Sequence, residues 1–330
     1  MKLSPHLNPK IFDSDVEQSA NRNGYGEGLK LAGEKFKNVV ALSADLVEST
    51  KTNLFAEAFP DRFIECGVAE QNMASVASGL AAMGKIPFIA SYAMFSPGRN
   101  WEQVRTTIAY NNANVKIIGA HAGVSVGPDG ATHQAIEDIA IMRVMPNMCV
   151  LAPVDKHEAR KMTLFVAERF GPIYMRLARN DTPVVTKEDS QFTFGKAEIF
   201  MEKSLDTKKS VAILSTGTMA YQALQAGKEL NESGVGASVI HFGTVKPLDV
   251  KMLEHLSREH DLIITIEEHQ AAGGFGSAVA EYLSEVKPTK ILRLGVRDQF
   301  GQSGTPEELL SHYGLDSRAI VKSVKEVLAS

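Results

Sequence analysis

The stretch Glu65-Cys66-Gly67-Val68-Ala69-Glu70-Gln71-Asn72-Met73 takes the chain from a short strand-like piece, residues 62–65, into a helix of small side chains. Glu70 stands in the first turn of that helix, where a carboxylate complements the helix dipole and the unpaired backbone amides. The helix can pack closely against another surface because it carries Ala74, Ala77, Gly79, Ala81 and Ala82. A structural role would be enough to explain Glu70, so the rest of the sequence must decide whether this carboxyl group is functional.

Apolar strands and amphipathic helices alternate along the remainder of the chain. The strand candidates are residues 39–43, 86–90, 115–119, 148–152, 211–214, 237–241, 262–266 and 291–294. Helical patterns cover residues 26–37, 101–111, 156–169, 220–232, 250–258 and 276–286. Continuous apolar strands that alternate with helices predict parallel sheets covered on both faces.

The length of 330 residues is too great for one ordinary core and fits two domains. Between residues 181 and 195 the pattern lapses into Thr, Pro and charged residues. We therefore predict an α/β fold with two doubly wound domains. A mostly parallel sheet forms the first domain over residues 1–185, a linker spans 186–196, and a smaller α/β domain spans 197–330.

The overall charge gives no reason to expect nucleic acid or a membrane as partner, since the net charge is −4 and the basic residues are dispersed. Only two cysteines occur, Cys66 and Cys149, so a disulfide framework is not indicated. The polar N-terminus has no signal-peptide core, and no apolar run reaches membrane length. These features predict a cytoplasmic protein.

Functional residues are expected in the loops that follow the strands, because ligands of doubly wound sheets bind at the carboxyl ends of strands. The loop over residues 121–134 contains His121, Asp129 and His133 among glycines and alanines, which favours a functional loop over a solvated turn. The spacing of the two histidines does not match a zinc site, and no metal ligands are predicted in this chain. The glycines at 273, 274 and 276 before a helix fit either close packing or an anion site.

Several motifs together resemble transketolase. They are residues 67–73, the loop 127–134 with Ile136-Glu137-Asp138, Pro146-Asn147, and Glu267-Glu268-His269 leading into Gly273-Gly274. The resemblance is to the C-terminal half of that family, meaning its pyrimidine-binding domain and its C-terminal domain, and it covers nearly the whole chain. It implies thiamine diphosphate as the cofactor and phosphorylated sugars as substrates.

The resemblance also implies roles for individual residues. Glu70 corresponds to the glutamate that contacts the aminopyrimidine, and Tyr92 and Phe95 correspond to the aromatic side chains that stack on this ring. Asp45 falls near the cofactor and the subunit contact. Catalytic roles fall on Glu70 and His133, sugar hydroxyl contacts on Asp129 and His133, and substrate phosphate contacts on Arg22, Ser49, His121 and Arg179. The loop after Pro97 is one residue longer than in some relatives, which leaves a cofactor contact at Arg99 in doubt.

The chemistry of these residues suits the implied roles. A glutamate that donates a hydrogen bond to the pyrimidine must keep its proton, and burial among small apolar neighbours favours that form. Arginines such as Arg22 and Arg179 form bidentate, charge-assisted bonds with phosphate. Without the resemblance, the arginines would be interpreted as surface ion pairs, and Tyr92 with Phe95 as a core pair.

The Gly-Asp-Gly tripeptide with which related enzymes hold magnesium and diphosphate is absent from the sequence. We therefore expect a separate N-terminal transketolase subunit that carries the diphosphate domain, holds Mg²⁺ (or Ca²⁺), and forms an α2β2-like assembly with this chain. Alone, the chain should bind the cofactor poorly.

Three functions compete. The favoured one is the pyrimidine-binding subunit of a split transketolase (EC 2.2.1.1-like) of carbohydrate metabolism, in the pentose phosphate pathway. The second is half of a 1-deoxy-D-xylulose-5-phosphate synthase-like enzyme or the beta subunit of a 2-oxo acid dehydrogenase. The third is a structural assembly subunit without catalytic residues.

Overall fold

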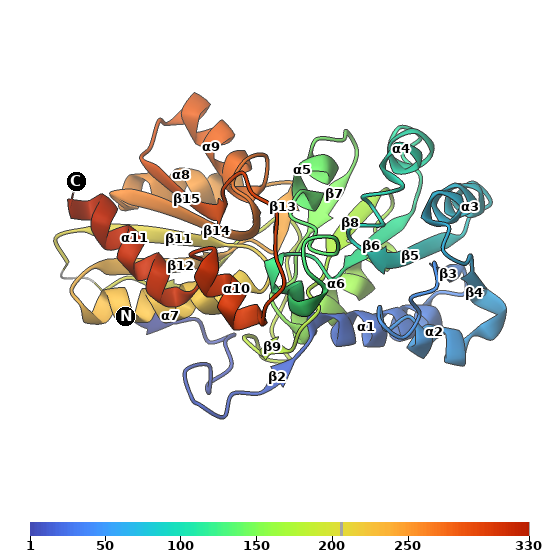
Figure 1. Cartoon of the computed structure of the whole chain (residues 1–330), viewed down its shortest axis with the longest axis horizontal. Helices are drawn as coiled ribbons and strands as arrows, with labels where there is room; N and C mark the ends of the chain where they lie inside the picture. The colour runs from blue at the N-terminus through green and yellow to red at the C-terminus, as the bar shows by residue number, and fades with distance from the viewer. Residues whose placement is uncertain (205–206, 330) are drawn as a thin grey trace.

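The computed structural model describes residues 1–204 and 207–329. They form two α/β units, each a sheet covered by helices, which lie side by side (Figure 1). The first sheet has the strand order β13-β7-β8-β6-β5-β3-β4, and every neighbouring pair is parallel except β13 with β7. Its strands are β3 (Val39–Ser43), β4 (Phe63–Glu65), β5 (Ile86–Tyr92), β6 (Lys116–Ala120), β7 (Cys149–Leu151), β8 (Ile173–Arg176) and β13 (Thr244–Lys246).

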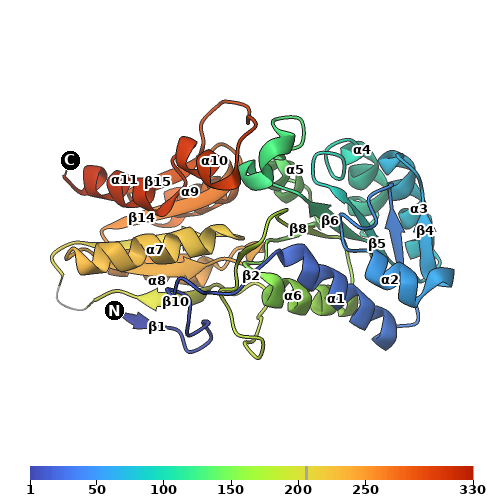
Figure 2. The ribbon, with the colours of Figure 1, turned by 60° about the horizontal axis from the view of Figure 1, so that its bottom comes forward.

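Helices cover both faces of this sheet because its strands are apolar on both sides. The helices α1 (Asn21–Lys35) and α6 (Lys156–Glu168) share one core cluster with the strands, and α3 (Glu70–Ala82) with α5 (Asp138–Arg143) share another. Figure 2 shows α1 and α6 together below the sheet. Between β3 and β4 lie α2 (Asn53–Ala58) and the short turn η1 (Pro60–Arg62).

The second sheet has the order β1-β10-β12-β11-β14-β15, in which β12, β11, β14 and β15 are parallel, while β10 pairs antiparallel with both β12 and β1. Its strands are β1 (Lys2–Leu3), β10 (Glu198–Glu202), β11 (Ser210–Ser215), β12 (Gly236–His241), β14 (Leu262–Gln270) and β15 (Ile291–Val296). The helices α7 (Met219–Glu232) and α11 (Ser317–Ala329) pack on one face, and α8 (Val250–Glu259) and α9 (Phe275–Val286) pack on the other. Outside these two sheets lie a short helix, α10 (Pro306–His312), a 3₁₀ turn, η3 (Val124–Asp129), and a two-strand ladder of β2 (Gln18–Ser19) with β9 (Thr182–Pro183).

These two mostly parallel, helix-covered sheets confirm the predicted α/β class. Two strands cross the predicted domain boundary: β1 joins the second sheet, and β13 extends the first. The boundary therefore stays a prediction, although residues 186–196 form no helix or named strand. None of the helices in the described residues is both long and apolar enough to cross a membrane.

The segment predicted as one helix over 101–111 is instead a short helix, α4 (Trp101–Gln103), followed by a π-helical turn, η2 (Val104–Ala109). The hydroxyl groups of Thr106 and Thr107 donate to the backbone carbonyl groups of Glu102 and Gln103, at 2.9 and 2.6 Å. Such bonds from threonine back to the preceding turn compete with regular helical pairing. A wider turn in this position is frequently found near functional sites.

Candidate active site

Glu70 lies at the first position of α3, directly after the turn that leaves β4, and its side chain is only 1% exposed. Its Oε2 atom accepts a hydrogen bond from Nη1 of Arg99 at 2.6 Å. Asn100, also buried, donates from Nδ2 to the backbone carbonyl group of Glu70 at 3.1 Å. The loop after β5 therefore closes over the start of α3 through two neighbouring side chains.

Four aromatic rings gather at the carboxyl ends of β5 and β6. The ring of Tyr92 stacks on His121 with centroids 3.8 Å apart and faces Phe95 at 5.8 Å. The imidazole of His133 meets Tyr92 and Phe95 edge-on, at 6.1 and 5.5 Å. The structure thus brings together four side chains that lie up to 41 positions apart in the sequence, as expected for loops at one edge of a parallel sheet.

Two arginines lie beside this aromatic cluster. Arg22, at the start of α1, donates from Nη1 to the carbonyl oxygen of Ser49 at 2.6 Å and from Nε to that of Arg179 at 3.1 Å. Arg179 donates to the carbonyl oxygen of Val126, and its Nε lies 3.8 Å from Oδ2 of Asp129. Backbone carbonyl groups take up part of the donor capacity of both arginines, and Asp129 partly balances the charge of Arg179.

The guanidinium groups of Arg22 and Arg179 lie close enough to His121 to affect the pKa of its imidazole. Its side chain is buried, its φ angle is +56°, and Nδ1 has no hydrogen-bond partner among the described residues. Burial and then the nearby guanidinium groups of Arg22 and Arg179 lower the pKa of His121 to about 3. The imidazole is therefore neutral near pH 7, and the net charge at this position comes from the arginines.

Asp45 and Ser49 occupy the loop after β3. Asp45 is exposed with a φ angle of +61°, and its backbone N–H donates to Oε1 of Glu65 at 2.8 Å. The same oxygen accepts the N–H of Gly67 at 2.8 Å, so Glu65 fixes the Asp45 loop to the turn before Glu70. Ser49 contributes its carbonyl oxygen to Arg22, as described above. The functional roles of both residues stay predictions.

The second half of the chain supports the loop that follows β6, which is a contact the sequence did not indicate. The buried carboxylate of Glu268, in β14, accepts the backbone N–H of Ser125 at 2.9 Å and the hydroxyl group of Thr218 at 3.2 Å. Gly123 makes this approach possible, because a Cβ atom there would lie 2.5 Å from Oε2 of Glu268. Its φ angle of +92° also requires glycine.

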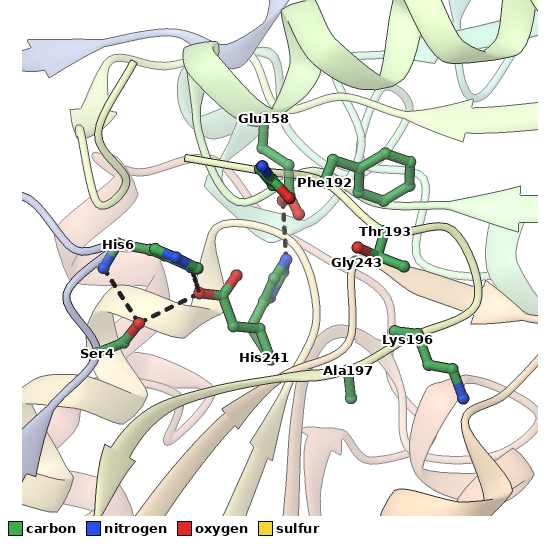
Figure 3. A pocket seen from close by; sticks show the side chains of 11 residues that line it. Ser4, His6, Glu158, Phe192, Thr193, Lys196, Ala197, His241 and Gly243 are labelled. Atoms are coloured by element: carbon green, nitrogen blue, oxygen red, sulfur yellow. Dashed lines mark hydrogen bonds and ion pairs between the residues drawn. The ribbon is translucent and has the colours of Figure 1, made fainter. Parts of the chain in front are cut away.

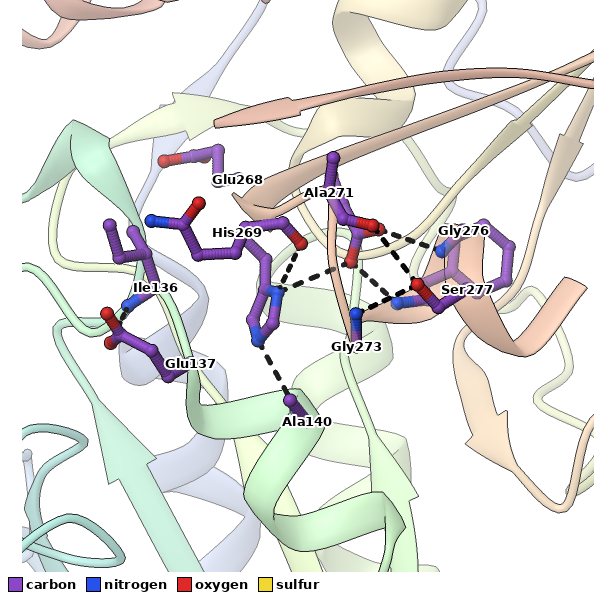
Figure 4. Close-up of polar contacts among 12 residues, drawn as sticks. Ile136, Glu137, Ala140, Glu268, His269, Ala271, Gly273, Gly276 and Ser277 are labelled. Atoms are coloured by element: carbon purple, nitrogen blue, oxygen red, sulfur yellow. Dashed lines mark hydrogen bonds and ion pairs between the residues drawn. The ribbon is translucent and has the colours of Figure 1, made fainter. Parts of the chain in front are cut away.

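Polar contacts next to Glu268 join the two halves of the chain (Figure 4). His269 accepts the N–H of Ala140 at Nε2, at 3.3 Å, and its Nδ1 lies 2.7 Å from the carbonyl oxygen of Gln270, which requires the Nδ1-protonated tautomer. The carboxylate of Glu267 accepts the backbone N–H groups of Phe275 and Gly276 at the start of α9. The amides considered for an anion site are therefore occupied by this side chain, and burial raises the pKa of the Glu267 carboxyl group.

A cavity of about 280 Å³ lies elsewhere, between the N-terminal segment, α6 and the second sheet (Figure 3). The buried imidazole of His241 contacts Glu158 there at 2.8 Å, and His6 contacts Glu198 at 2.8 Å. None of the predicted site residues lines this cavity, so the candidate active site remains at the carboxyl ends of β3, β4, β5 and β6.

Comparison with known proteins identifies the family. Residues 17–184 match the profile "Transketolase, pyrimidine binding domain", and residues 202–320 match "Transketolase, C-terminal domain". Together these two profiles cover most of the chain. The chain therefore belongs to the transketolase family, whose members depend in general on thiamine diphosphate.

Its relatives include separate proteins of similar length. The putative transketolase C-terminal section of Methanocaldococcus jannaschii is 45% identical over 92% of this chain and 95% of its own length. A 6-deoxy-6-sulfo-D-fructose transketolase subunit of Clostridium sp. (strain MSTE9) is 38% identical over 96% of this chain and 97% of its own length. A solved structure described as "Split gene transketolase, inactive beta4 tetramer" superposes with a TM-score of 0.85 at 42% identity, over 95% of this chain and 99% of that one.

The residues at the site fit one part of thiamine diphosphate. Glu70 is a buried carboxyl group whose Oε2 receives an N–H donor from a flat cationic group, and Phe95 lies beneath that group with the guanidinium carbon 4.7 Å from its ring centroid. An aminopyrimidine is likewise a flat group that can hydrogen-bond a carboxyl group while its face lies on an aromatic ring. Within the described residues, no group of three or more His, Cys, Asp or Glu side chains could hold a metal ion. The buried carboxyl group and the aromatic face thus fit the aminopyrimidine part of the cofactor.

Proposed function

We propose that this chain is the pyrimidine-binding subunit of a split transketolase that acts in the cytoplasm and moves a two-carbon ketol unit between phosphorylated sugars. A separate subunit would carry the diphosphate-binding domain and hold Mg²⁺ or Ca²⁺, in an α2β2-like assembly. The proposal rests on the buried Glu70 with its flat donor over Phe95. The full-length similarity to a transketolase C-terminal section supports the division into two subunits.

In this complex, the chain would bind the pyrimidine ring of the cofactor and hold the proton of the hydrogen bond between Glu70 and that ring. Thiamine diphosphate, when bound, supplies the thiazolium group that stabilises a carbanion. Glu70 would hold a hydrogen bond to the pyrimidine, while Phe95 and Tyr92 offer flat apolar area and exclude water. Asp45 would lie at the edge of this cofactor site, near the subunit contact.

The cationic side of the site would bind the substrate. Arg22 and Arg179, with Ser49 and His121, would contact a terminal phosphate, and Asp129 and His133 would contact sugar hydroxyl groups. A neutral His121 can donate one hydrogen bond and accept another, which suits a sugar as well as a phosphate. The Clostridium relative, named for a sulfonated sugar, makes a terminal sulfonate worth testing, because the same arginines can pair with either anion.

The test is an assay of this chain with and without a co-purified partner subunit. We expect ketol transfer between sugar phosphates only in the complex, and a loss of at least about a hundredfold in kcat for Glu70→Ala. Robust transfer by this chain alone would reject the two-subunit proposal, and unchanged activity of the Glu70→Ala complex would leave a structural role. Turnover of pyruvate with glyceraldehyde phosphate in place of ketol transfer would favour the deoxyxylulose-phosphate synthase-like alternative, and oxidative decarboxylation of a 2-oxo acid would favour the dehydrogenase alternative.

A further inference from the structure

Arg99 occupies the position that the proposed function gives to the cofactor's aminopyrimidine. Its Nη1 atom is 2.6 Å from Oε2 of Glu70, and its guanidinium carbon lies 4.7 Å from the ring centroid of Phe95. A guanidinium and an aminopyrimidine are both flat groups that pack on aromatic faces and hydrogen-bond a carboxyl group, the guanidinium as donor to the carboxylate and the pyrimidine nitrogen as acceptor from the protonated acid. One side chain of the protein thus makes both contacts that the ring would make.

We propose that Arg99 fills the pyrimidine site while the cofactor is absent, and that the cofactor binds by displacing it. This inference rests on the proposed function, because it takes Glu70 and Phe95 as the pyrimidine contacts. It explains how a buried carboxyl group keeps a partner in the empty site, since a buried charge without one is costly.

The two partners differ in how easily they can separate. The side chain of Glu70 is 1% exposed, whereas that of Arg99 is 47% exposed. The arginine can therefore rotate into water and remain solvated, while the glutamate cannot leave. A ligand that takes over the hydrogen bond to Glu70 can therefore replace the guanidinium without leaving the buried carboxyl group unpaired.

The backbone beneath Arg99 is anchored, so the exchange requires only a side-chain rotation. The N–H of Arg99 donates to the carbonyl oxygen of Phe95 at 2.9 Å. Asn100, which is fully buried, bonds both to the backbone of Glu70 and to the hydroxyl group of Ser96, each at 3.1 Å. These bonds fix the loop on α3 whichever rotamer Arg99 adopts.

The proposal predicts that the arginine competes with the cofactor. Removing the competitor should tighten binding, because the apparent dissociation constant falls as the fraction of open sites rises. We expect Arg99→Met to lower the dissociation constant for thiamine diphosphate by about three- to tenfold. Arg99→Lys keeps the charge and loses the flat plane over Phe95, so it should have a smaller effect in the same direction.

The experiment titrates the reconstituted complex of this chain and its diphosphate-binding partner with thiamine diphosphate and Mg²⁺ and follows tryptophan fluorescence. Trp101 is the single tryptophan of this chain, and a complex that carries Trp101→Phe gives the background of the partner. Trp101 lies two positions after Arg99, and its Nε1 donates to the carbonyl oxygen of Ile141 at 2.9 Å. The matched control is Arg105→Gln, which changes an exposed arginine further along the same segment and should leave binding unchanged. Thermal unfolding of each variant confirms that it is folded.

The outcomes separate this inference from the proposed function. If Glu70→Gln weakens binding while Arg99→Met and Arg99→Lys bind no tighter than the wild type, the competition is refuted and the assignment of Glu70 stands. If Glu70→Gln has no effect, the pyrimidine site itself is misassigned and both proposals fail. No detectable binding by the wild type or either Arg99 variant also overturns the competition, because removal of Arg99 should expose a measurable site.

Discussion

Two glycines of α1, Gly24 and Gly28, lie against the backbone of α6 at different distances. Replacing each by alanine tests how tightly these helices pack next to the proposed substrate site. A Cβ atom built on Gly24 of α1 would lie 1.8 Å from the backbone carbonyl oxygen of Lys156 in α6, about 1.6 Å short of the 3.4 Å at which ordinary contact begins. One built on Gly28 would lie 2.8 Å from the carbonyl oxygen of Arg160. Both obstacles are backbone atoms, so a substitution to alanine must move one helix.

The expected free energies of unfolding follow from two opposing effects. Replacing glycine by alanine inside a helix stabilises it by up to about 1 kcal/mol. Overpacking costs about 1–3 kcal/mol, and more where the backbone must shift. We expect Gly24→Ala to destabilise the protein by about 2 kcal/mol or more and Gly28→Ala to destabilise it less. Gly79→Ala, in α3 where a Cβ atom would meet nothing within 4 Å, should stabilise it by up to about 1 kcal/mol.

Urea unfolding of the three variants measures these differences, with equal m-values as the condition for comparing midpoints. Because Arg22 lies two positions before Gly24, a shifted α1 should also weaken the contact of Arg22 with Ser49 and raise KM for the phosphorylated substrate in the reconstituted complex. Equal stability of Gly24→Ala and Gly79→Ala would refute the argument, since it would mean that α1 and α6 separate without cost.

Two further predictions concern buried charges. Arg176→Met should lower the free energy of unfolding in urea by about 3–5 kcal/mol, because it leaves the buried carboxylate of Asp138 without its cation, 2.9 Å away in the wild type. The double variant with Asp138→Leu should recover most of this loss. A loss below about 1 kcal/mol in the single variant would contradict the prediction. His241 should make stability depend on pH: burial lowers the pKa of His241, but the attraction of Glu158 and other carboxylates raises it above the ordinary 6.5. The folded state then holds the proton more tightly than the unfolded one, so this stabilisation is complete below pH 6.5 and is lost as the pH rises through the folded pKa. His241→Asn should flatten the fall in urea midpoint as the pH rises above 6.5, and an unchanged slope would show that the pair does not stabilise the fold.

The sequence predicts the fold well where the pattern is local. The amphipathic helices over 156–169 and 220–232 appear as α6 and α7 with ends shifted by no more than one residue, because their apolar period and flanking strands are visible without tertiary information. Strand β8 is not predicted from the sequence, because it ends in a charged residue, Arg176. In the structure this side chain is buried against Asp138, 38 positions away. A partner at that distance in the chain cannot be read from a local pattern.

The candidate site shows the same division between local and distant information. The resemblance supplied Glu70, Tyr92 and Phe95 from their motifs, and the loop after β6 supplied its histidines. Glu268 also stands in one of the resembling motifs, but no role could be assigned to it from the sequence, because its contact with Ser125 depends on how the second sheet meets the first. Arg99 stood in doubt on loop length alone, and only the three-dimensional path of the loop brings it to Glu70.

Strands β1 and β13 each join the sheet formed mainly by the other half of the chain, which affects how the protein folds during its synthesis. A ribosome releases residues in order, so the first sheet lacks its outer strand β13 until residues 244–246 have emerged, and β1 waits for β10 at residues 198–202. An exposed strand edge during that interval is a template for aggregation. Cutting the gene between residues 186 and 196 to express each half alone should therefore give poorly soluble fragments, whereas mixing them during refolding should restore both sheets.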